Sequence, residues 1–355
     1  MSPKARKRPT GIPAVRVPPS DSRDFLKRIL AVCACILFLS VTACAATSDL
    51  LEYKEERPYF GATVTLHCFF SPQIPAGEIV ESCWLRLDDI QNTMSVHAEN
   101  GDLVALNRAG TEPVQVKSST YELIKRSAVY SQMTGGAFDV TIYPLVEFWK
   151  DAEKQGTYPK VAEVNNQKIK VNYTNLGFIK PDEILLTQAG MKVDLGGVAK
   201  GYAVDEVARI LLKGGIRDFM IDAGGDMYCR GGRGGERGWP IGIQDPTREG
   251  GIIGVLDMVD MAVTTSGDYS RYYTINGKRL SHIIDPRTGY PQERATSATV
   301  ITPSAEEADA LSTALCVLGG PEGIALIETI PNAEALIVEN HEGTLKTYRS
   351  TGFPE

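Results

Sequence analysis

The chain has 355 residues with a formal net charge of −7, and 43% of its residues are hydrophobic. Residues 1–43 carry a net positive charge, so the remaining chain is more acidic than the whole, with 29 basic and 42 acidic residues and a net charge of −13. Such a remainder does not bind nucleic acid by releasing counterions, so we expect no nucleic-acid partner. The negative electrostatic field of this remainder would repel a polyanionic ligand, and a single lysine at the binding site would not offset that repulsion. If the ligand is a polyanion, we therefore expect a bound metal ion.

The N-terminus has the pattern of a secretory signal. A basic segment ends at Lys27-Arg28 and is followed by an apolar stretch, Ile29 to Val41, that is shorter than the roughly 20 residues needed to span a bilayer. The stretch ends in Val41-Thr42-Ala43-Cys44, which fits the cleavage box of a bacterial lipoprotein and would make Cys44 the lipidated first residue. An uncleaved anchor helix is the alternative interpretation.

The remaining chain is long enough for a large core, and no linker-like run divides it. We expect a signal peptide at residues 1–43, a lipidated N-terminus with a short tether at residues 44–55, and one folded domain at residues 56–355. The protein would then be lipid-anchored in the bacterial cell envelope. It would face the periplasm or the extracytoplasmic side of the inner membrane.

The cysteines of the mature chain have no spacing typical of a metal site. We interpret Cys68, Cys83, Cys229 and Cys316 as buried thiols. A bridge between Cys68 and Cys83 stays open, because the expected compartment is oxidising.

Hydrophobic periodicity predicts a mixture of helices and strands. Extended segments are expected at Ala62 to Phe70, Val193 to Leu195, Phe219 to Asp222, Ile241 to Ile243, Ile252 to Met258, Arg271 to Ile275 and Thr296 to Thr302. Helices are expected at Ile79 to Met94, Thr120 to Thr134 and Val198 to Leu212. The glycine-rich run Gly231 to Gly238 is expected to be a mobile loop. The mixture predicts an α+β fold with mostly antiparallel sheet and packed helices.

One glycine-rich turn has the composition of a pyrophosphate site. The run from Val193 to Tyr202, VDLGGVAKGY, places Asp194, two glycines and Lys200 where a helix begins. The glycines let a ligand approach the backbone, the first helix amides are expected to be unsatisfied, and the helix dipole adds positive potential. Tight packing in front of an amphipathic helix produces the same pattern.

A later helix offers oxygen ligands for a hard cation. Ser304 and Glu307 form a capping box, and Asp309 and Thr313 follow four residues apart on one helix face. A carboxylate with a hydroxyl suits Mg²⁺ or Ca²⁺ better than zinc. An acid in the early turns of a helix is also stabilised by the dipole without any metal.

The polar turn from Ser281 to Pro291 carries one of only four histidines in the chain. His282 is a candidate base, or its ring satisfies a neighbour within the turn. Asp285-Pro286 either takes part in the reaction or only fixes the backbone conformation of the turn.

Six motifs occur in order: GGAFDVT with Pro144-Leu145, then DLGGVAKGYAVD, DAGGD, TTSGDY, HIIDPRTGYP and EEADALSTA. Together they resemble the FAD:protein FMN transferase (ApbE) family from about Tyr59 onward. The resemblance implies a single large domain related to the T-fold, in which Mg²⁺ bridges the FAD pyrophosphate. In that family FMN is transferred to a threonine hydroxyl of an acceptor protein with release of AMP, and some members instead hydrolyse FAD.

The resemblance also implies site residues. The family's metal ligands fall on Asp309, Thr313 and a backbone carbonyl near Gly197. FAD contacts fall on Phe60, His97, Ala137, Phe138, Asp139, Asp194, Lys200 and the backbone at Ile283. His282 is the candidate that takes a proton from the acceptor hydroxyl or from water, with Asp285 as the alternative base.

His97 is a departure from the family pattern, because Met94-Ser95-Val96-His97 ends where many transferases have a tyrosine. The register is supported by Leu106-Asn107, which stands at the family's distance after His97. An imidazole stacks less on a flavin than a phenol ring does and adds a titratable group. Whether water or a protein hydroxyl receives the FMN is therefore open.

Three functions are compatible with these motifs. The first is a Mg²⁺-dependent transferase that modifies membrane redox-complex subunits with FAD as its substrate. The second is a Mg²⁺-dependent FAD pyrophosphatase that produces FMN and AMP. The third is a lipoprotein that binds flavin without turnover, which leaves Asp309, Thr313 and Lys200 unexplained.

Overall fold

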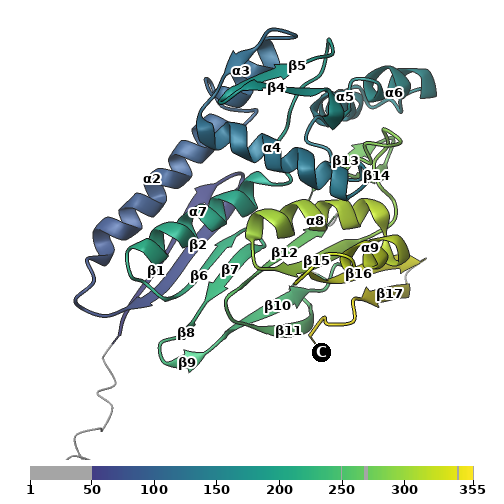
Figure 1. Cartoon of the computed structure of the whole chain (residues 1–355). Coiled ribbons are helices and arrows are strands. Elements are labelled where there is room, and N and C mark those ends of the chain that lie inside the picture. Colours follow the sequence, from purple (N-terminus) through teal and green to yellow (C-terminus); the bar gives the residue numbers. More distant parts are fainter. Residues whose placement is uncertain (1–49, 249, 268–270, 342–343, 355) are drawn as a thin grey trace, which may run out of the picture. The chain divides into compact units, whose positions relative to one another are not determined.

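The computed structural model describes residues 50–248, 250–267, 271–341 and 344–354 (Figure 1). These residues fall in one compact unit. The expected signal peptide, Cys44 and the first half of the expected tether lie outside them, as do Asp268 and Tyr269 of the TTSGDY motif. Residues 51–55, expected in the tether, belong instead to the first strand, Leu51–Tyr59. Among the described residues, no helix combines the length and the apolar character that crossing a bilayer requires.

An eight-stranded antiparallel sheet forms the centre of the domain, in the order β1-β2-β6-β7-β12-β15-β16-β17. Its strands are β1 (Leu51–Tyr59), β2 (Ala62–Phe70), β6 (Asp218–Ala223), β7 (Asp226–Arg230), β12 (Met261–Gly267), β15 (Ser297–Thr302), β16 (Glu334–His341) and β17 (Thr344–Arg349). All six residues of β15 are buried, while β1 at the sheet edge is mostly exposed. This burial pattern follows from β15 being covered on both faces.

Helices pack on one face of this sheet, and Figure 1 shows α2, α7, α8 and α9 lying along it. The helices are α2 (Ala76–Met94), α3 (Asp102–Arg108), α4 (Ser118–Met133), α5 (Tyr143–Gln155), α6 (Val161–Lys168), α7 (Ala199–Lys213), α8 (Ala305–Leu318) and α9 (Gly320–Ile327). Nearly every residue of α8 is buried, since the helix lies between α7, α4 and strands β12 and β15. The buried residues include Glu306, Asp309 and Ser312, which therefore need partners inside the domain.

Smaller elements complete the domain. The hairpin of β10 (Trp239–Gln244) and β11 (Ile252–Met258) forms a second core on the other face of the large sheet. A third core joins α5 and α6 to the hairpin of β13 (Tyr272–Ile275) and β14 (Lys278–Ser281). The remaining elements are β3 (Val114–Gln115), β4 (Leu176–Lys180) and β5 (Glu183–Leu186) in a three-stranded sheet, β8 (Gly232–Arg233) and β9 (Glu236–Arg237) in a hairpin, and a 3₁₀ turn at Tyr173–Asn175.

The structure confirms the α+β prediction with antiparallel sheet, and the expected strand Ile252 to Met258 coincides with β11. Two local expectations are wrong. Residues 193–195 belong to no strand, because the pairing there is a single bridge between Ile142 and Lys192. The expected loop at Gly231 to Gly238 is a short hairpin, whose turn uses the positive φ of Gly234 and Gly235.

The four cysteines in the described residues are buried free thiols, as expected. Burial raises the pKa of the Cys68 thiol to about 12. No disulfide joins Cys68 to Cys83.

Candidate functional site

The glycine-rich turn before α7 is held by a residue from α3. Asn107 donates from Nδ2 to the carbonyl oxygen of Val193 at 2.8 Å, and its Oδ1 accepts from the Val193 amide at 2.6 Å. The next residue, Asp194, accepts from the Gly196 amide at 2.8 Å. The turn therefore has a fixed path, which places Lys200 in the first turn of α7.

Several amides at the start of α7 are already occupied. The N–H groups of Val198 and Ala199 donate to the carbonyl of Leu195 at 3.0 and 2.8 Å, and that of Gly201 donates to Asp309 Oδ2 at 3.1 Å. The expectation that the first amides are unsatisfied is wrong for these three, because the turn closes on itself and α8 supplies an acceptor. Binding of an anion here would rest on side-chain cations and a metal ion more than on helix amides.

Helices α7 and α8 cross at close range. A Cβ at Gly201 would lie 2.1 Å from the carbonyl oxygen of Ala305, so only glycine permits this approach. Asp309 lies beside the crossing and is 2% exposed, with its Oδ1 4.0 Å from Lys200 Nζ. Burial raises the pKa of the Asp309 carboxyl, and the Lys200 ammonium opposes this effect. The crossing thus brings two residues that the sequence singled out close to one another.

The N-terminus of α8 is fixed from α7. Ser304 Oγ accepts from the Glu307 amide at 3.3 Å, which confirms the N-cap half of the expected capping box. Asp205 of α7 adds to it, since its carboxylate accepts from Ser304 Oγ at 2.7 Å and from the amides of Ala305 and Glu306 at 2.9 and 3.0 Å. This cap from a neighbouring helix sets the axial position of α8 and therefore the height of Asp309.

The other two predicted metal ligands lie close together. A Cβ at Gly197 would lie 3.2 Å from Thr313 Oγ1 and 3.3 Å from the ring of Phe138. Ser266 Oγ, on β12, lies 3.4 Å from the same Thr313 oxygen and 2.8 Å from Ser312 Oγ. The Asp309 carboxylate and the Thr313 hydroxyl therefore both lie against the first residues of α7 and the turn before it, and oxygen donors of this kind suit a hard cation.

The charge at the crossing also suits a cation. Asp226, at the start of β7, is 1% exposed and contacts Lys200 Nζ. Its other oxygen, Oδ1, has no hydrogen-bond partner in the described residues. Two buried carboxylates, Asp226 and Asp309, beside one lysine leave a net negative charge that a divalent cation would compensate. The described residues contain no group of three or more His, Cys, Asp or Glu side chains with metal-ligand geometry.

The GGAFDVT segment lies next to this crossing. The ring of Phe138 approaches Gly197, and Ala137 is 1% exposed. Asp139 accepts from the amide and hydroxyl of Thr141 at 2.8 and 2.7 Å and from the Tyr173 amide at 3.0 Å. Burial raises the pKa of Asp139, while the bonds from Thr141 oppose it. In this structure Asp139 therefore holds the turn between α4 and α5.

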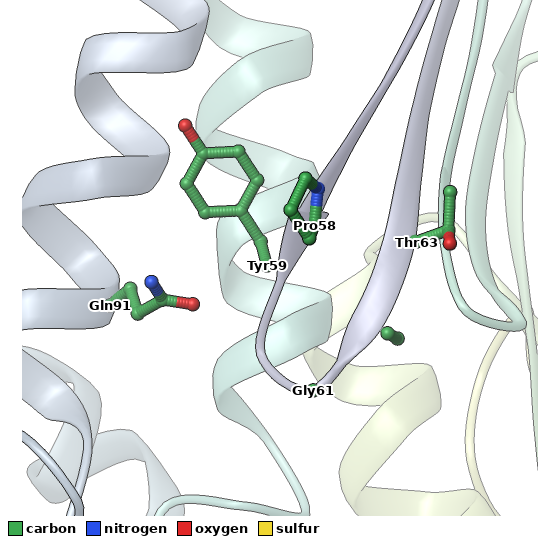
Figure 2. Close-up of a pocket in the computed structure, with 6 residues that line it drawn as sticks. Pro58, Tyr59, Gly61, Thr63 and Gln91 are labelled. Carbon is green, nitrogen blue, oxygen red and sulfur yellow. The ribbon is translucent and has the colours of Figure 1, made fainter.

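The turn between β1 and β2 forms one rim of the site. Phe60 has a φ of 55°, which is rare for a bulky residue, and its N–H donates to Gln91 Oε1 at 2.7 Å. An open pocket of about 350 Å³ lies at this turn. Figure 2 shows Tyr59 and Gln91 on one side of the turn and Thr63 on the other. Pro58, Gly61 and Ala62 complete its lining.

The hairpin β13–β14 brings His282 to the same rim. Arg271 donates from Nη2 to the carbonyl of Gly61 at 3.2 Å, and its own carbonyl lies 2.9 Å from His282 Nδ1. A carbonyl can only accept, so Nδ1 carries the proton and Nε2 keeps a lone pair. Burial lowers the pKa of His282 to about 4, and the charges of Arg271 and Lys200 act in the same direction. His282 is therefore a neutral imidazole at pH 7, as a general base requires.

The alternative base is placed less well. Asp285 accepts from the Arg287 amide at 2.8 Å and from its guanidinium at 3.0 and 3.1 Å, so both carboxylate oxygens are held by one cation. The geometry favours His282. Ile283 is 8% exposed, its amide donates to Ser281 Oγ at 3.1 Å and its carbonyl accepts from the Gln292 amide at 2.9 Å.

His97 lies just beyond the end of α2, and its side chain is exposed. Its amide donates to Ser95 Oγ at 3.1 Å. Burial raises the pKa of Asp194, and His97 is close enough to oppose that rise electrostatically. The residue that departs from the family pattern therefore lies near a predicted FAD contact.

The sequence matches the ApbE family over residues 60–337. This chain belongs to the ApbE family. The FAD:protein FMN transferase of Treponema pallidum (strain Nichols) is 29% identical over 329 residues, covering 87% of this chain and 90% of that protein. The enzyme of the same name from Escherichia coli (strain K12) is 31% identical over 303 residues, covering 81% of this chain and 86% of that protein.

Solved structures of the ApbE family share the fold. The flavin transferase ApbE from Vibrio cholerae superposes with a TM-score of 0.76 at 28% identity, covering 86% of this chain and 98% of that one. The ApbE protein from Thermotoga maritima has a TM-score of 0.77 at 33% identity, covering 85% of this chain and 98% of that one. The single large α+β domain expected from the resemblance is confirmed.

Sequence reasoning assigned no role to three residues that shape this site. Asp226 stands in the DAGGD motif, whose second acid was a usable signal. Asn107 was noted only for its distance from His97, although its side chain fixes the turn before Asp194. Arg271 carried no motif signal, because its contacts with Gly61 and His282 are tertiary.

Proposed function

We propose that this protein is a Mg²⁺-dependent FAD:protein FMN transferase, which attaches FMN through a phosphoester bond to a threonine of an acceptor protein and releases AMP. The observation that carries the proposal is the convergence of Lys200, Asp309 and Thr313 at the crossing of α7 and α8. The names of the relatives support the same activity.

Asp309, Thr313 and the backbone carbonyl near Gly197 would hold the Mg²⁺ ion. Bound there, Mg²⁺ supplies a Lewis acid that polarises the pyrophosphate oxygens. Lys200 adds a fixed positive charge on the same side, and together these cations overcome the negative field of an acidic chain. The rings of Phe60 and Phe138 are the expected aromatic contacts for FAD.

In the transfer step, the threonine oxygen of the acceptor attacks the phosphorus of the FMN half of FAD. The hydroxyl proton passes to Nε2 of His282, and the bond to the AMP phosphate breaks, with AMP leaving with the electron pair. His282 can take this proton because its imidazole is neutral above a pKa of about 4. The bond from Nδ1 to the Arg271 carbonyl fixes the reactive tautomer.

Hydrolysis of FAD to FMN and AMP is the second candidate activity, with water in place of the acceptor hydroxyl. The observation that favours it is His97, because an exposed imidazole at the position of a stacking tyrosine would retain the flavin less firmly. The same base and the same cations would serve both reactions.

Mass spectrometry separates these activities. The chain from residue 45 onward is incubated with FAD and Mg²⁺, with and without a threonine-bearing acceptor domain from a flavin-carrying membrane subunit. FMN mass on the acceptor supports the transferase. Equal free FMN and AMP regardless of acceptor supports hydrolysis, and intact FAD after prolonged incubation supports a binding protein and contradicts both enzymatic proposals.

We also propose that Cys44 is lipidated and holds the domain on the extracytoplasmic side of the inner membrane, where membrane redox-complex subunits would be its acceptors. The basic segment, short apolar stretch and Val41-Thr42-Ala43-Cys44 box support this location. Replacing Cys44 with serine should move the protein from the membrane fraction to the soluble fraction. A membrane-bound Cys44→Ser protein would contradict the lipid anchor.

A further inference from the structure

The ammonium of Lys200 lies between two buried carboxylates that come from different elements. It contacts Asp226 on β7, while its Nζ is 4.0 Å from Oδ1 of Asp309 on α8. Asp226 and Asp309 are 1% and 2% exposed. The lysine is thus in direct contact with Asp226 and at the outer distance limit of an ion pair with Asp309.

The remaining contacts of the two acids differ. Oδ2 of Asp309 accepts from the Gly201 amide at 3.1 Å, which leaves its Oδ1 on the side of Lys200. Oδ2 of Asp226 holds Lys200, while its Oδ1 is buried without a hydrogen-bond partner in the part of the chain that the structure describes. A buried carboxylate oxygen without a hydrogen-bond partner lowers the stability of the fold. Asp226 therefore binds Lys200 at the expense of folding stability.

We propose that Asp226 is a positioning residue that holds Lys200 away from Asp309 and so keeps Oδ1 of Asp309 available to Mg²⁺. The inference rests on the proposed function, because it concerns the metal of that same site. An ammonium and a divalent cation compete for one carboxylate oxygen, since each is attracted by the same charge. With Asp226 in place, the lysine keeps its closer contact with Asp226, and the metal meets Oδ1 of Asp309 with only a distant ammonium beside it.

The substitution Asp226→Asn keeps the shape of the side chain and removes its charge. Lys200 then has Asp309 as its remaining carboxylate partner at the crossing. We expect the Mg²⁺ concentration for half-maximal FMN transfer to rise about 10-fold or more, the usual size of effect for a residue that supports a metal ligand. Mn²⁺ binding with FAD present, measured by the EPR signal of free Mn²⁺, should weaken by a similar factor.

The double variant Asp226→Asn with Lys200→Met tests the mechanism. Without the lysine there is no competitor, so its Mn²⁺ affinity should equal that of Lys200→Met alone. If Asp226 only supports the fold, Asp226→Asn weakens Mn²⁺ binding equally with and without Lys200, which overturns the inference. If Asp226→Asn alone does not fold, a weaker Mn²⁺ affinity of the double variant than of Lys200→Met still overturns the inference.

A matched control is Asp218→Asn on β6, whose carboxylate accepts from the Gly232 amide at 2.8 Å and lies outside the crossing. Its Mg²⁺ requirement should equal that of the wild type. If wild-type protein turns over FAD without any dependence on Mg²⁺, the proposed function fails. If the wild type depends on Mg²⁺ and Asp226→Asn leaves that requirement unchanged, only the positioning role of Asp226 fails.

Discussion

The two sides of the candidate site are built differently. At the crossing of α7 and α8, Asp226 and Asp309 are almost fully buried, and hydrogen bonds from neighbouring elements fix each helix start. At the rim, Phe60 lies in a tight turn that an exposed Arg271 ties to the β13–β14 hairpin. Packing across the core sets the first region, whereas a few surface contacts set the second. Changes at the crossing should therefore affect chemistry, and changes at the rim should affect how FAD is held.

The largest effect should come from Asp309→Ala, which removes the carboxylate ligand at the crossing. We expect Mg²⁺-dependent turnover of FAD to fall about 100-fold or more, because the stabilisation of the leaving phosphate is lost. The unfolding temperature should change little, since relief of excess buried charge offsets the lost bond to Gly201. Glu322→Gln, at an exposed ion pair on α9, is the control. Unchanged turnover of Asp309→Ala would disprove the metal assignment.

His282 connects the two regions, because its ring is held at the rim while Lys200 influences its charge. Replacing it with glutamine should lower turnover about 100-fold or more by removing the base. In the wild type, the acidic limb of the pH profile of kcat/KM should lie near pH 4, well below the ordinary value of 6.5 for histidine. An acidic limb near 6.5 would show that the pKa of His282 is not lowered in the working enzyme.

The same histidine should make stability depend on pH. Its folded pKa of about 4 lies below the ordinary 6.5, so the unfolded chain binds more protons between these values. The free energy of unfolding should therefore fall as the pH falls from 6.5 towards 4. In urea titrations across this range, His282→Gln should show a shallower fall than the wild type, and equal slopes would show that another group is responsible.

A smaller effect should follow from Arg271→Ala at the rim. It removes the bond to the Gly61 carbonyl but keeps the backbone carbonyl that orients His282. A single exposed hydrogen bond is worth about 1 kcal/mol, so the KM for FAD should rise about 3- to 10-fold while kcat stays near wild type. The control is Lys278→Ala on the same hairpin, which removes an exposed ion pair with Glu293. A large fall in kcat for Arg271→Ala would place it in the chemistry instead.

The difference between the regions also explains what the sequence could predict. Asp309 and Thr313 were predicted as a pair of metal ligands from helical spacing, and in the structure they lie one turn apart on α8, with Thr313 beside Gly197. Local patterns of this kind are visible in sequence because they depend on 3.6-residue periodicity. The pairing of Lys200 with Asp226 was not predicted, because it depends on how β7 packs against α7.

Other failures have the same origin. The first amides of α7 were expected to be unsatisfied, but Gly201 donates to Asp309, which is 108 residues away in sequence. The sequence left Asp285 as a possible base, and only the structure shows that the guanidinium of Arg287 donates to both of its carboxylate oxygens. Backbone and ion-pair partners come from tertiary packing, which a motif does not encode.

The smallest effect should come from His97→Tyr, which introduces the aromatic residue that the resemblance led us to expect at this position. His97 is exposed and acts on Asp194 only through its charge, so the exchange disturbs no packed contact. An added ring stack is worth about 0.5–1.5 kcal/mol, so FAD should bind about 2- to 10-fold more tightly, as measured by flavin fluorescence. Firmer retention of flavin should also raise the ratio of acceptor-bound FMN to free FMN. If that ratio stays unchanged while affinity rises, the choice between transfer and hydrolysis is made elsewhere, at His282 and the acceptor's approach to it.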